Sequence, residues 1–352
     1  MAVTQKQIAQ YLSISQPQVA QALNGQPGVS EATRQRVLEA AKKLGYNAKS
    51  NEGARRMAAL RYGKSVKTGT VAVLMGDFFE GLPLHELPFF REILRGLHDE
   101  MRSFDSHAAT YYISRTGSLP TALMSGGVDG IICLYSSTTE WKLDEMQFDV
   151  PLVRLGGATA RWNLRPDDYQ GMLEATRHLI ELGHRRIAFL GDLEQKFSIF
   201  VHDERLRGFQ DAMSQAGLTM HDDLLFNLEE PSTQDGFNAM QQALQSGREF
   251  SAVVCLNDLS ALGALNAARQ HGLQVPRDMS ITGFDGLEWE HLPAVELTSV
   301  HFDRELMGRK AVRQIYAASE TGQCPAQELL PVQLLIRNST APARAREKVL
   351  LA

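Results

Sequence analysis

Three glutamines near the N-terminus have the chemistry to read a nucleobase. Gln16, Gln18 and Gln21 fall within one short helical pattern, and their spacing points them away from its apolar positions. A glutamine amide both donates and accepts, so it can form two hydrogen bonds with adenine in the major groove of DNA. The alternative for each of them is an ordinary polar side chain in contact with water.

Two further polar residues follow apolar runs in the body of the chain. Asn257 comes directly after the run 252–256, and Asp285 closes the segment that begins at Met279. In parallel sheets a ligand crevice lies at the carboxyl ends of the strands. A carboxylate there accepts hydrogen bonds from hydroxyl groups, and an amide both accepts and donates. The alternative for Asp285 is a turn-forming residue at a strand end.

Sequence signatures of catalysis are absent. The chain has no glycine-rich phosphate-binding loop, no nucleophile elbow and no cluster with metal-ligand spacing. His178 and His184 are six residues apart and do not share a helical face. We therefore expect no enzyme activity, no cofactor and no metal. Cys133 and Cys255 lie in apolar runs, which favours reduced, buried thiols over disulfides.

Charge is distributed unevenly along the 352 residues. Residues 1–66 hold ten Lys or Arg against three acids, a net of +7, while the whole chain carries −5, so the remainder carries −12. A small basic segment on an acidic body indicates a unit that binds a polyanion.

The first 46 residues have the pattern of three short helices. Thr4 with Gln7 and Ser15 with Gln18 have the capping-box form, and Ser30 is placed to cap a third helix. A tight turn between the first two helices favours a helix-turn-helix unit, with a generic helical bundle as the alternative. The apolar residues at helical spacing are Val19, Ala22 and Leu23 in the second helix, and Val37, Leu38, Ala41 and Leu44 in the third.

Strand and helix patterns alternate from residue 68 onward. Repeated strand–helix units predict parallel sheets with helices on both faces, and the double series predicts two lobes with a crevice between them. The expected strands are 70–75, 109–113, 128–134, 151–155, 186–190, 252–256 and 279–282, and the expected helices include 171–182 and 203–216.

The N-terminal segment resembles the DNA-binding head of the lactose-repressor (LacI/GalR) family. The motifs are Val3-Thr4-x3-Ile8-Ala9, Val19-x2-Ala22-Leu23-Asn24-Gly25, Val29-Ser30-x2-Thr33-Arg34-x-Arg36-Val37 and Leu44-Gly45-Tyr46. The resemblance implies that the second helix lies in the major groove, where Gln16, Pro17 and Gln21 choose bases. Pro17 has no side-chain donor and Gln21 replaces the usual arginine, so an unusual operator preference is expected. The residues expected to contact DNA are Thr4, Ser15, Gln16, Pro17, Gln18, Gln21, Asn24, Ser30, Thr33, Arg34, Tyr46, Arg55, Met57 and Leu60.

The segment 47–68 matches the family's hinge helix and linker in position, but it is roughly five residues longer than usual, judged by that resemblance, and contains Gly53. In the family this helix folds on DNA and inserts a leucine into the minor groove. Met57 fits the Ala-Arg-x-Leu frame and is favoured as the wedge, whereas Leu60 fits the spacing to the next strand. The alternative is a linker whose helix never forms.

The body resembles the family's effector domain, which is similar to periplasmic sugar-binding proteins. Matching pieces include 128–132, 182–187, 204–209, 257–263 and 283–285. By that resemblance Arg205, Asn257 and Asp285 bind the effector, because guanidinium, amide and carboxylate groups suit a polyhydroxylated ligand. Phe302 falls at a frequent contact position. Further aromatic candidates in loops are Trp289, Trp162 and Phe78.

These features together predict an α/β protein with an all-α helix-turn-helix head at 1–46, a hinge at 47–68, two doubly wound parallel-sheet lobes of periplasmic-binding-protein type at 69–340, and a tail at 341–352. The expected function is a transcription regulator that binds operator DNA. A repressor controlled by a small molecule, a sugar or sugar derivative, is favoured, with an activator or dual regulator responding to a non-sugar metabolite as the alternative.

The start of the chain has no secretory pattern and no apolar run is long enough to span a membrane, so a cytoplasmic protein is expected. The tail is too short for the heptad helix that tetramerises some relatives, which favours a homodimer.

Overall fold

A computed structural model of the chain describes residues 3–23, 28–46, 67–76, 88–113, 119–120, 123, 127–134, 148–156, 162–194, 199–288 and 296–344. The chain divides into two compact units, Met1–Lys67 and Thr68–Ala352.

The first unit is built on three helices that pack against one another, α1 (Gln5–Leu12), α2 (Gln16–Leu23) and α3 (Glu31–Leu44). Each helix contributes small or branched apolar residues to one shared core. These buried residues are Ile8, Ala9, Val19, Ala22, Val37, Ala40 and Ala41. The all-α head predicted from the sequence is confirmed.

The predicted helix caps are also confirmed. The Thr4 side chain accepts a hydrogen bond from the backbone N–H of Gln7, and the Gln7 side chain accepts one from the backbone N–H of Thr4 at 2.8 Å. Ser30 caps α3, which ends at Gly45 in the left-handed conformation (φ 70°). These caps satisfy terminal backbone groups that a short helix cannot pair by itself.

One apolar residue at helical spacing in α3, Leu38, does not lie in the core. Leu38 is 43% exposed, and Ala40 occupies the interior instead. The buried face of α3 follows Val37, Ala40 and Ala41. Because successive residues of a helix are rotated by about 100°, Leu38 falls beside this face rather than on it.

The second unit consists of two lobes, each built on a six-stranded sheet. In the first sheet the strands are ordered β11-β5-β4-β3-β1-β2 and all pairs are parallel. The strands are β1 (Thr70–Gly76), β2 (His107–Ile113), β3 (Gly130–Leu134), β4 (Leu152–Leu155), β5 (Leu164–Pro166) and β11 (Glu328–Leu330).

The second sheet has the order β12-β10-β9-β8-β6-β7, and only its pairing of β10 with β12 is antiparallel among the described strands. Its strands are β6 (Ile187–Gly191), β7 (Leu225–Asn227), β8 (Ala252–Cys255), β9 (Ser280–Asp285), β10 (Thr298–Phe302) and β12 (Val332–Leu335), with a 3-10 turn at Asp222–Leu224 before β7. The predicted α/β class with parallel sheets is confirmed.

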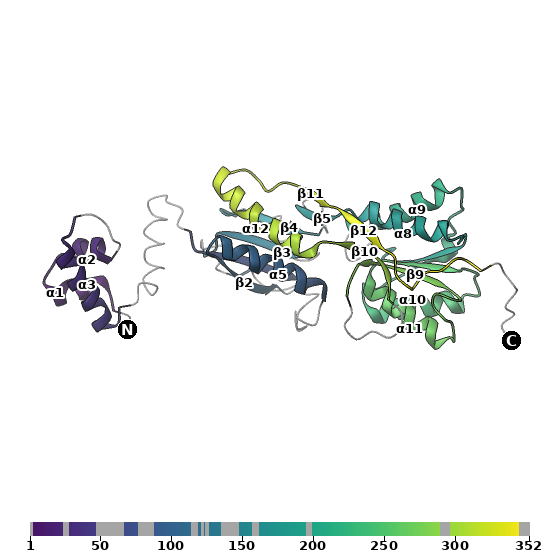
Figure 1. Cartoon of the computed structure of the whole chain (residues 1–352), viewed down its shortest axis with the longest axis horizontal. Coiled ribbons are helices and arrows are strands. Elements are labelled where there is room, and N and C mark those ends of the chain that lie inside the picture. The colour runs from purple at the N-terminus through teal and green to yellow at the C-terminus, as the bar shows by residue number, and fades with distance from the viewer. Residues whose placement is uncertain are drawn as a thin grey trace. The chain divides into compact units, whose positions relative to one another are not determined.

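Helices cover the sheets in pairs (Figure 1). In the first lobe α5 (Pro88–Ser103) packs against α12 (Arg304–Thr321), and both contact the first sheet. In the second lobe, α8 (Asp168–Glu181) and α9 (Ile199–Gln215) lie on one side of the sheet, and α10 (Thr233–Gln245) and α11 (Asp258–Gln270) on the other.

The chain passes between the lobes three times. It crosses from β5 to α8, returns from β10 to α12, and crosses again from β11 to β12. At two of these crossings an aspartate caps the helix that follows. Asp167 accepts from the backbone N–H of Gln170, and Asp303 accepts from that of Leu306. The first helical residues after these caps are Asp168 and Arg304. Each of them therefore directly follows a segment in which the chain crosses from one lobe to the other.

Glycines bring the paired helices of the first lobe into close backbone contact. A Cβ atom at Gly96 of α5 would overlap the backbone of Glu305, and one at Gly308 of α12 would overlap the carbonyl of Ile93. Two reciprocal contacts of this kind leave no room for the helices to slide independently.

Cys133 and Cys255 are buried free thiols, as predicted, and Cys324 is exposed. Within the described residues, every helix is too short or too polar to cross a membrane.

Candidate functional site

The N-terminal end of α2 presents most of the predicted base-reading residues to solvent. Ser15, Gln16, Pro17 and Gln18 are all exposed. Gln18 also has a structural task, because its Oε1 accepts hydrogen bonds from the backbone N–H and the hydroxyl of Ser15, both at 3.1 Å. These two contacts hold the Gln18 side chain against the start of the helix.

Gln21 lies one turn further along α2 and is half-buried, and a Cβ atom placed at Gly28 would lie 3.4 Å from its amide. Tyr46 accepts a hydrogen bond from Gln5 at 3.2 Å, which fastens the end of the head to α1. Thr4 and Ser30 are exposed helix caps, whereas Thr33 and Arg34 on α3 are half-buried.

Six of the predicted contacts lie outside the described residues. They are Asn24, Arg55, Met57 and Leu60 for DNA, and Phe78 and Trp289 for the effector.

Arg205 of α9 is held inside the second lobe by a carboxylate, a carbonyl and an aromatic ring. Its Nε donates to Oδ1 of Asp168 at 2.8 Å, and its Nη1 donates to the carbonyl of Leu256 at 2.6 Å. The guanidinium carbon lies 3.6 Å from the centre of the Phe284 ring. Arg205 is 6% exposed, so these contacts replace water around a buried cation.

Asp285 faces the same guanidinium from the end of β9. Its Oδ1 lies 3.8 Å from Nη2 of Arg205, which is an ion pair but too long for a hydrogen bond. Its backbone has φ 116°, a region that only glycine enters without strain. Burial raises the pKa of Asp285 to about 6, although Arg205 and Arg304 partly oppose that shift.

A second buried carboxylate holds the turn that follows Asp285. Asp258 accepts hydrogen bonds from the backbone N–H of Leu287 at 2.6 Å and from the hydroxyl of Ser299 at 2.5 Å. The Ser299 oxygen in turn accepts from the N–H of Gly286 at 3.0 Å. Burial and the neighbouring Asp285 carboxylate raise the pKa of Asp258 to about 8.

The carbonyl side of the same turn is held by Arg304. Its guanidinium donates to the carbonyl of Asp285 and, at 3.5 Å, to that of Gly286. Its Nε also donates to Oε2 of Glu92, on α5 of the first lobe, at 2.8 Å. Arg304 is 1% exposed.

Two of the other described effector candidates already have packing or hydrogen-bond partners. Asn257 caps α11, where it accepts from Ser260 at 2.8 Å and donates to the carbonyl of Pro231 at 3.1 Å. Phe302 is 1% exposed and packs edge-on against Phe89. The structure therefore brings Arg205 and Asp285 together, and it places Asn257 one residue beyond the carbonyl that Arg205 binds.

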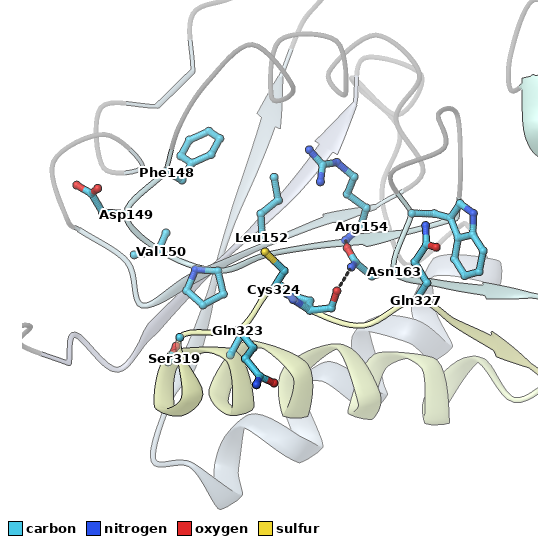
Figure 2. Close-up of a pocket in the computed structure, with 15 residues that line it drawn as sticks. Phe148, Asp149, Val150, Leu152, Arg154, Asn163, Ser319, Gln323, Cys324 and Gln327 are labelled. Carbon is cyan, nitrogen blue, oxygen red and sulfur yellow. Dashed lines mark hydrogen bonds between the residues drawn. The ribbon is translucent and has the colours of Figure 1, made fainter.

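A cavity of about 720 Å³ lies apart from these residues, between the start of β4 and the end of α12 (Figure 2). Its lining includes Arg154, Trp162 and Cys324. The Trp162 ring stacks on Arg165, with 4.5 Å between the guanidinium carbon and the ring centre. Among the described effector candidates, Trp162 lines this cavity, whereas Arg205, Asn257, Asp285 and Phe302 do not.

Comparison with known proteins decides the family. Residues 176–340 match the periplasmic binding protein-like domain. The HTH-type transcriptional regulator AglR of Rhizobium meliloti (strain 1021) is 31% identical over 360 residues, which cover 98% of this chain and 96% of that protein. The chain belongs to the LacI family of transcription regulators. Its relatives are regulators rather than enzymes.

Solved structures of the LacI family share the fold over nearly the whole chain. The complex of the transcriptional regulator CelR with cellobiose is 27% identical and has a TM-score of 0.68, covering 96% of this chain and 99% of that one. The Lac repressor dimer bound to operator and the anti-inducer ONPF has a TM-score of 0.77 at 23% identity, covering 97% and 100%.

Sequence reasoning about this LacI-family regulator missed four charged residues of the site. Asp168 binds Arg205, Asp258 and Arg304 hold the turn that carries Asp285, and Glu92 binds Arg304. Asp258 carried a signal, since it directly follows Asn257 at a strand end. The position of Arg304 after a capping aspartate is a weaker signal, and nothing local in the sequence marks Glu92 as its partner 212 residues away.

Proposed function

We propose that this LacI-family regulator is a homodimeric repressor that acts in the cytoplasm and whose affinity for operator DNA is set by a carbohydrate bound at Arg205 and Asp285. Two heads of a dimer would bind half-sites of a pseudo-palindrome, spaced by whole turns of the DNA helix. The Lac repressor dimer on its operator and the CelR–cellobiose complex support the dimer and the ligand class.

The effector site is supported by hydrogen-bonding groups of Arg205 and Asp285 that do not bond to each other. A guanidinium has five N–H donors, and the bonds to Asp168 and Leu256 use two of those in Arg205. At 3.8 Å the Asp285 carboxylate is too far to accept one of the rest. Vicinal hydroxyls of a sugar could accept from the guanidinium and donate to the carboxylate at once.

Both residues are less than 10% exposed, so we expect the structure around them to open when a ligand enters. Rearrangement of the lobes on binding would then change the separation of the hinges that lead to the heads. The effect on DNA can be no larger than the difference in ligand affinity between the two arrangements.

A thermal-shift screen of the full chain tests the effector site. The panel contains mono- and disaccharides, sugar acids and purines, and a ligand that binds only the folded state raises the melting temperature. We expect a neutral carbohydrate to stabilise the wild-type protein, and Asp285→Asn to remove that shift. Asp211→Asn, which changes a carboxylate on α9 that bonds Tyr169 instead, should keep it. Stabilisation by purines alone would contradict the ligand class, and an unchanged shift in Asp285→Asn would contradict the site.

A further inference from the structure

Arg304 is in contact with both lobes at the point where the chain passes between them. It is the first residue of α12, directly after the crossing from β10. Its guanidinium binds Glu92 of the first lobe through Nε and Nη2, both at 2.8 Å, and binds the carbonyls of Asp285 and Gly286 in the second lobe. A single buried side chain thus joins helix α5 to the turn that carries Asp285.

The turn is held on both of its polar edges. Arg304 binds the carbonyl oxygens of residues 285 and 286, while Ser299 and Asp258 bind the amides of Gly286 and Leu287. Asp285 has a strained backbone, and such a conformation persists only where its surroundings over-determine it. The orientation of the Asp285 carboxylate therefore depends on Arg304.

On the first-lobe side, Arg304 is anchored to a rigid pair of helices. Gly96 and Gly308 bring the backbones of α5 and α12 into contact. Arg313 adds two bonds to Glu100, at 2.8 and 3.1 Å, between the same helices. A displacement at Arg304 would consequently move α5 and α12 as one body rather than being absorbed between them.

Burial makes the Arg304 contacts costly to break. Arg304 is 1% exposed, and a buried cation that loses its anion is strongly destabilising. When Asp285 and its turn shift, Arg304 must either lose carbonyl partners or carry Glu92 along. Two packed bodies joined by such a contact tend to move together between discrete arrangements.

We propose that Arg304 is a positioning residue that transmits the state of the Asp285 turn to the first lobe through Glu92. The inference rests on the proposed function, in which Asp285 binds the effector. It adds the physical connection by which occupancy of that site would reach helices α5 and α12.

Hydrogen–deuterium exchange of the full chain tests this connection without ligand or DNA. The reporters are the amides of Gly286 and Leu287, read by mass spectrometry on peptides that contain them. Glu92→Gln keeps the size of the side chain but removes the charge that holds Arg304. Weakening one charge-assisted hydrogen bond is expected to speed exchange at this turn by about tenfold.

Glu100→Gln is the matched control, because it weakens an ion pair between the same two helices that has no contact with the turn. The inference requires fast exchange at residues 286 and 287 in Glu92→Gln and wild-type exchange in Glu100→Gln. Equal behaviour of the two variants at the turn, changed or unchanged, overturns it.

The double variant shows whether the route passes through Arg304. In an Arg304→Met background, Glu92→Gln should add nothing to exchange at the turn, because its partner is already gone. A further acceleration there would overturn the role of Arg304. Failure of the proposed effector would appear separately, as a sugar panel that leaves the melting temperature unchanged.

Discussion

Asp258 and Ser299 share a hydrogen bond of 2.5 Å inside the second lobe, where both side chains are fully buried. The Asp258 carboxyl group also accepts a hydrogen bond from the N–H of Leu287. These two hydrogen bonds replace the water that the carboxyl group loses on burial. Burial, together with the neighbouring Asp285 carboxylate, raises the pKa of Asp258 to about 8, so its protonated form is favoured over a wider pH range than that of an ordinary aspartate.

A raised pKa makes the stability of the second lobe pH-dependent in a defined direction. Between about pH 4, near the ordinary value of an aspartate, and the folded-state value of about 8, the folded protein binds more protons than the unfolded chain. The stabilising contribution is therefore complete at low pH and is lost as pH rises through 8. Asp258→Asn mimics the protonated acid and should reduce the change of the free energy of unfolding with pH. Urea denaturation at pH 5, 6.5 and 8 measures this free energy. A difference in free energy between wild type and variant that stays constant with pH would contradict the raised pKa of Asp258.

The partner of Arg205 should matter more for stability than an exposed ion pair on the same helix. Asp168→Asn removes the only carboxylate that is hydrogen-bonded to the buried guanidinium among the described residues, leaving Asp285 at 3.8 Å, and is expected to lower the free energy of unfolding by about 3 kcal/mol. Glu204→Gln breaks the pair with Arg207, whose side chain is 56% exposed, and should cost less than about 1 kcal/mol. Equal losses in a urea titration would show that the Arg205–Asp168 contact is not energetically special.

Substitutions of the three glutamines of α2 should affect base preference differently. Gln16→Ala and Gln21→Ala are expected to alter the sequence logo obtained by selection from random duplex DNA, because the family resemblance predicts that their amides contact base edges. Gln18→Ala should instead weaken the head by about 1 kcal/mol, because its Oε1 caps the helix through Ser15. An altered logo in Gln18→Ala together with unchanged logos in the other two would reverse these roles.

The close packing of α5 and α12 can be tested at Gly308. Helix propensity alone predicts that Gly308→Ala stabilises the protein by about 1 kcal/mol. The new methyl group would overlap the backbone of α5, and overpacking of this kind costs about 1–3 kcal/mol. We expect a lower midpoint of thermal unfolding, and a higher one would show that the helices separate without penalty.

Local signals predicted much of this fold. The caps at Thr4, Ser30 and Gly45 were readable because each places a specific side chain or a left-handed glycine at a helix end. Apolar runs likewise marked the inner strands of both sheets. Helix α10 was not assigned, because its buried face is made mainly of Gly236, Ala239 and Ala243, which give a weak apolar signal.

The charged surroundings of the site were beyond sequence reasoning. Glu92 meets Arg304 because α5 packs against α12, and Asp168 meets Arg205 because α8 packs against α9. Such pairings are set by tertiary structure rather than by spacing along the sequence. The burial of Phe302 was likewise not readable from its sequence position. The family resemblance predicts an effector contact at this position, yet the side chain is buried in the core. Its role as an effector contact stays a prediction.

Control of DNA binding by the effector is tested most directly by the affinity for selected operator DNA, measured with and without the stabilising carbohydrate from the thermal-shift panel. The wild-type protein should change its operator affinity at least fivefold when the sugar is added, within the range typical of allosteric coupling. Asp285→Asn should bind the same operator with affinity that no longer depends on the sugar. A sugar that binds the wild-type protein but leaves its operator affinity unchanged would contradict the claim that this site controls DNA binding.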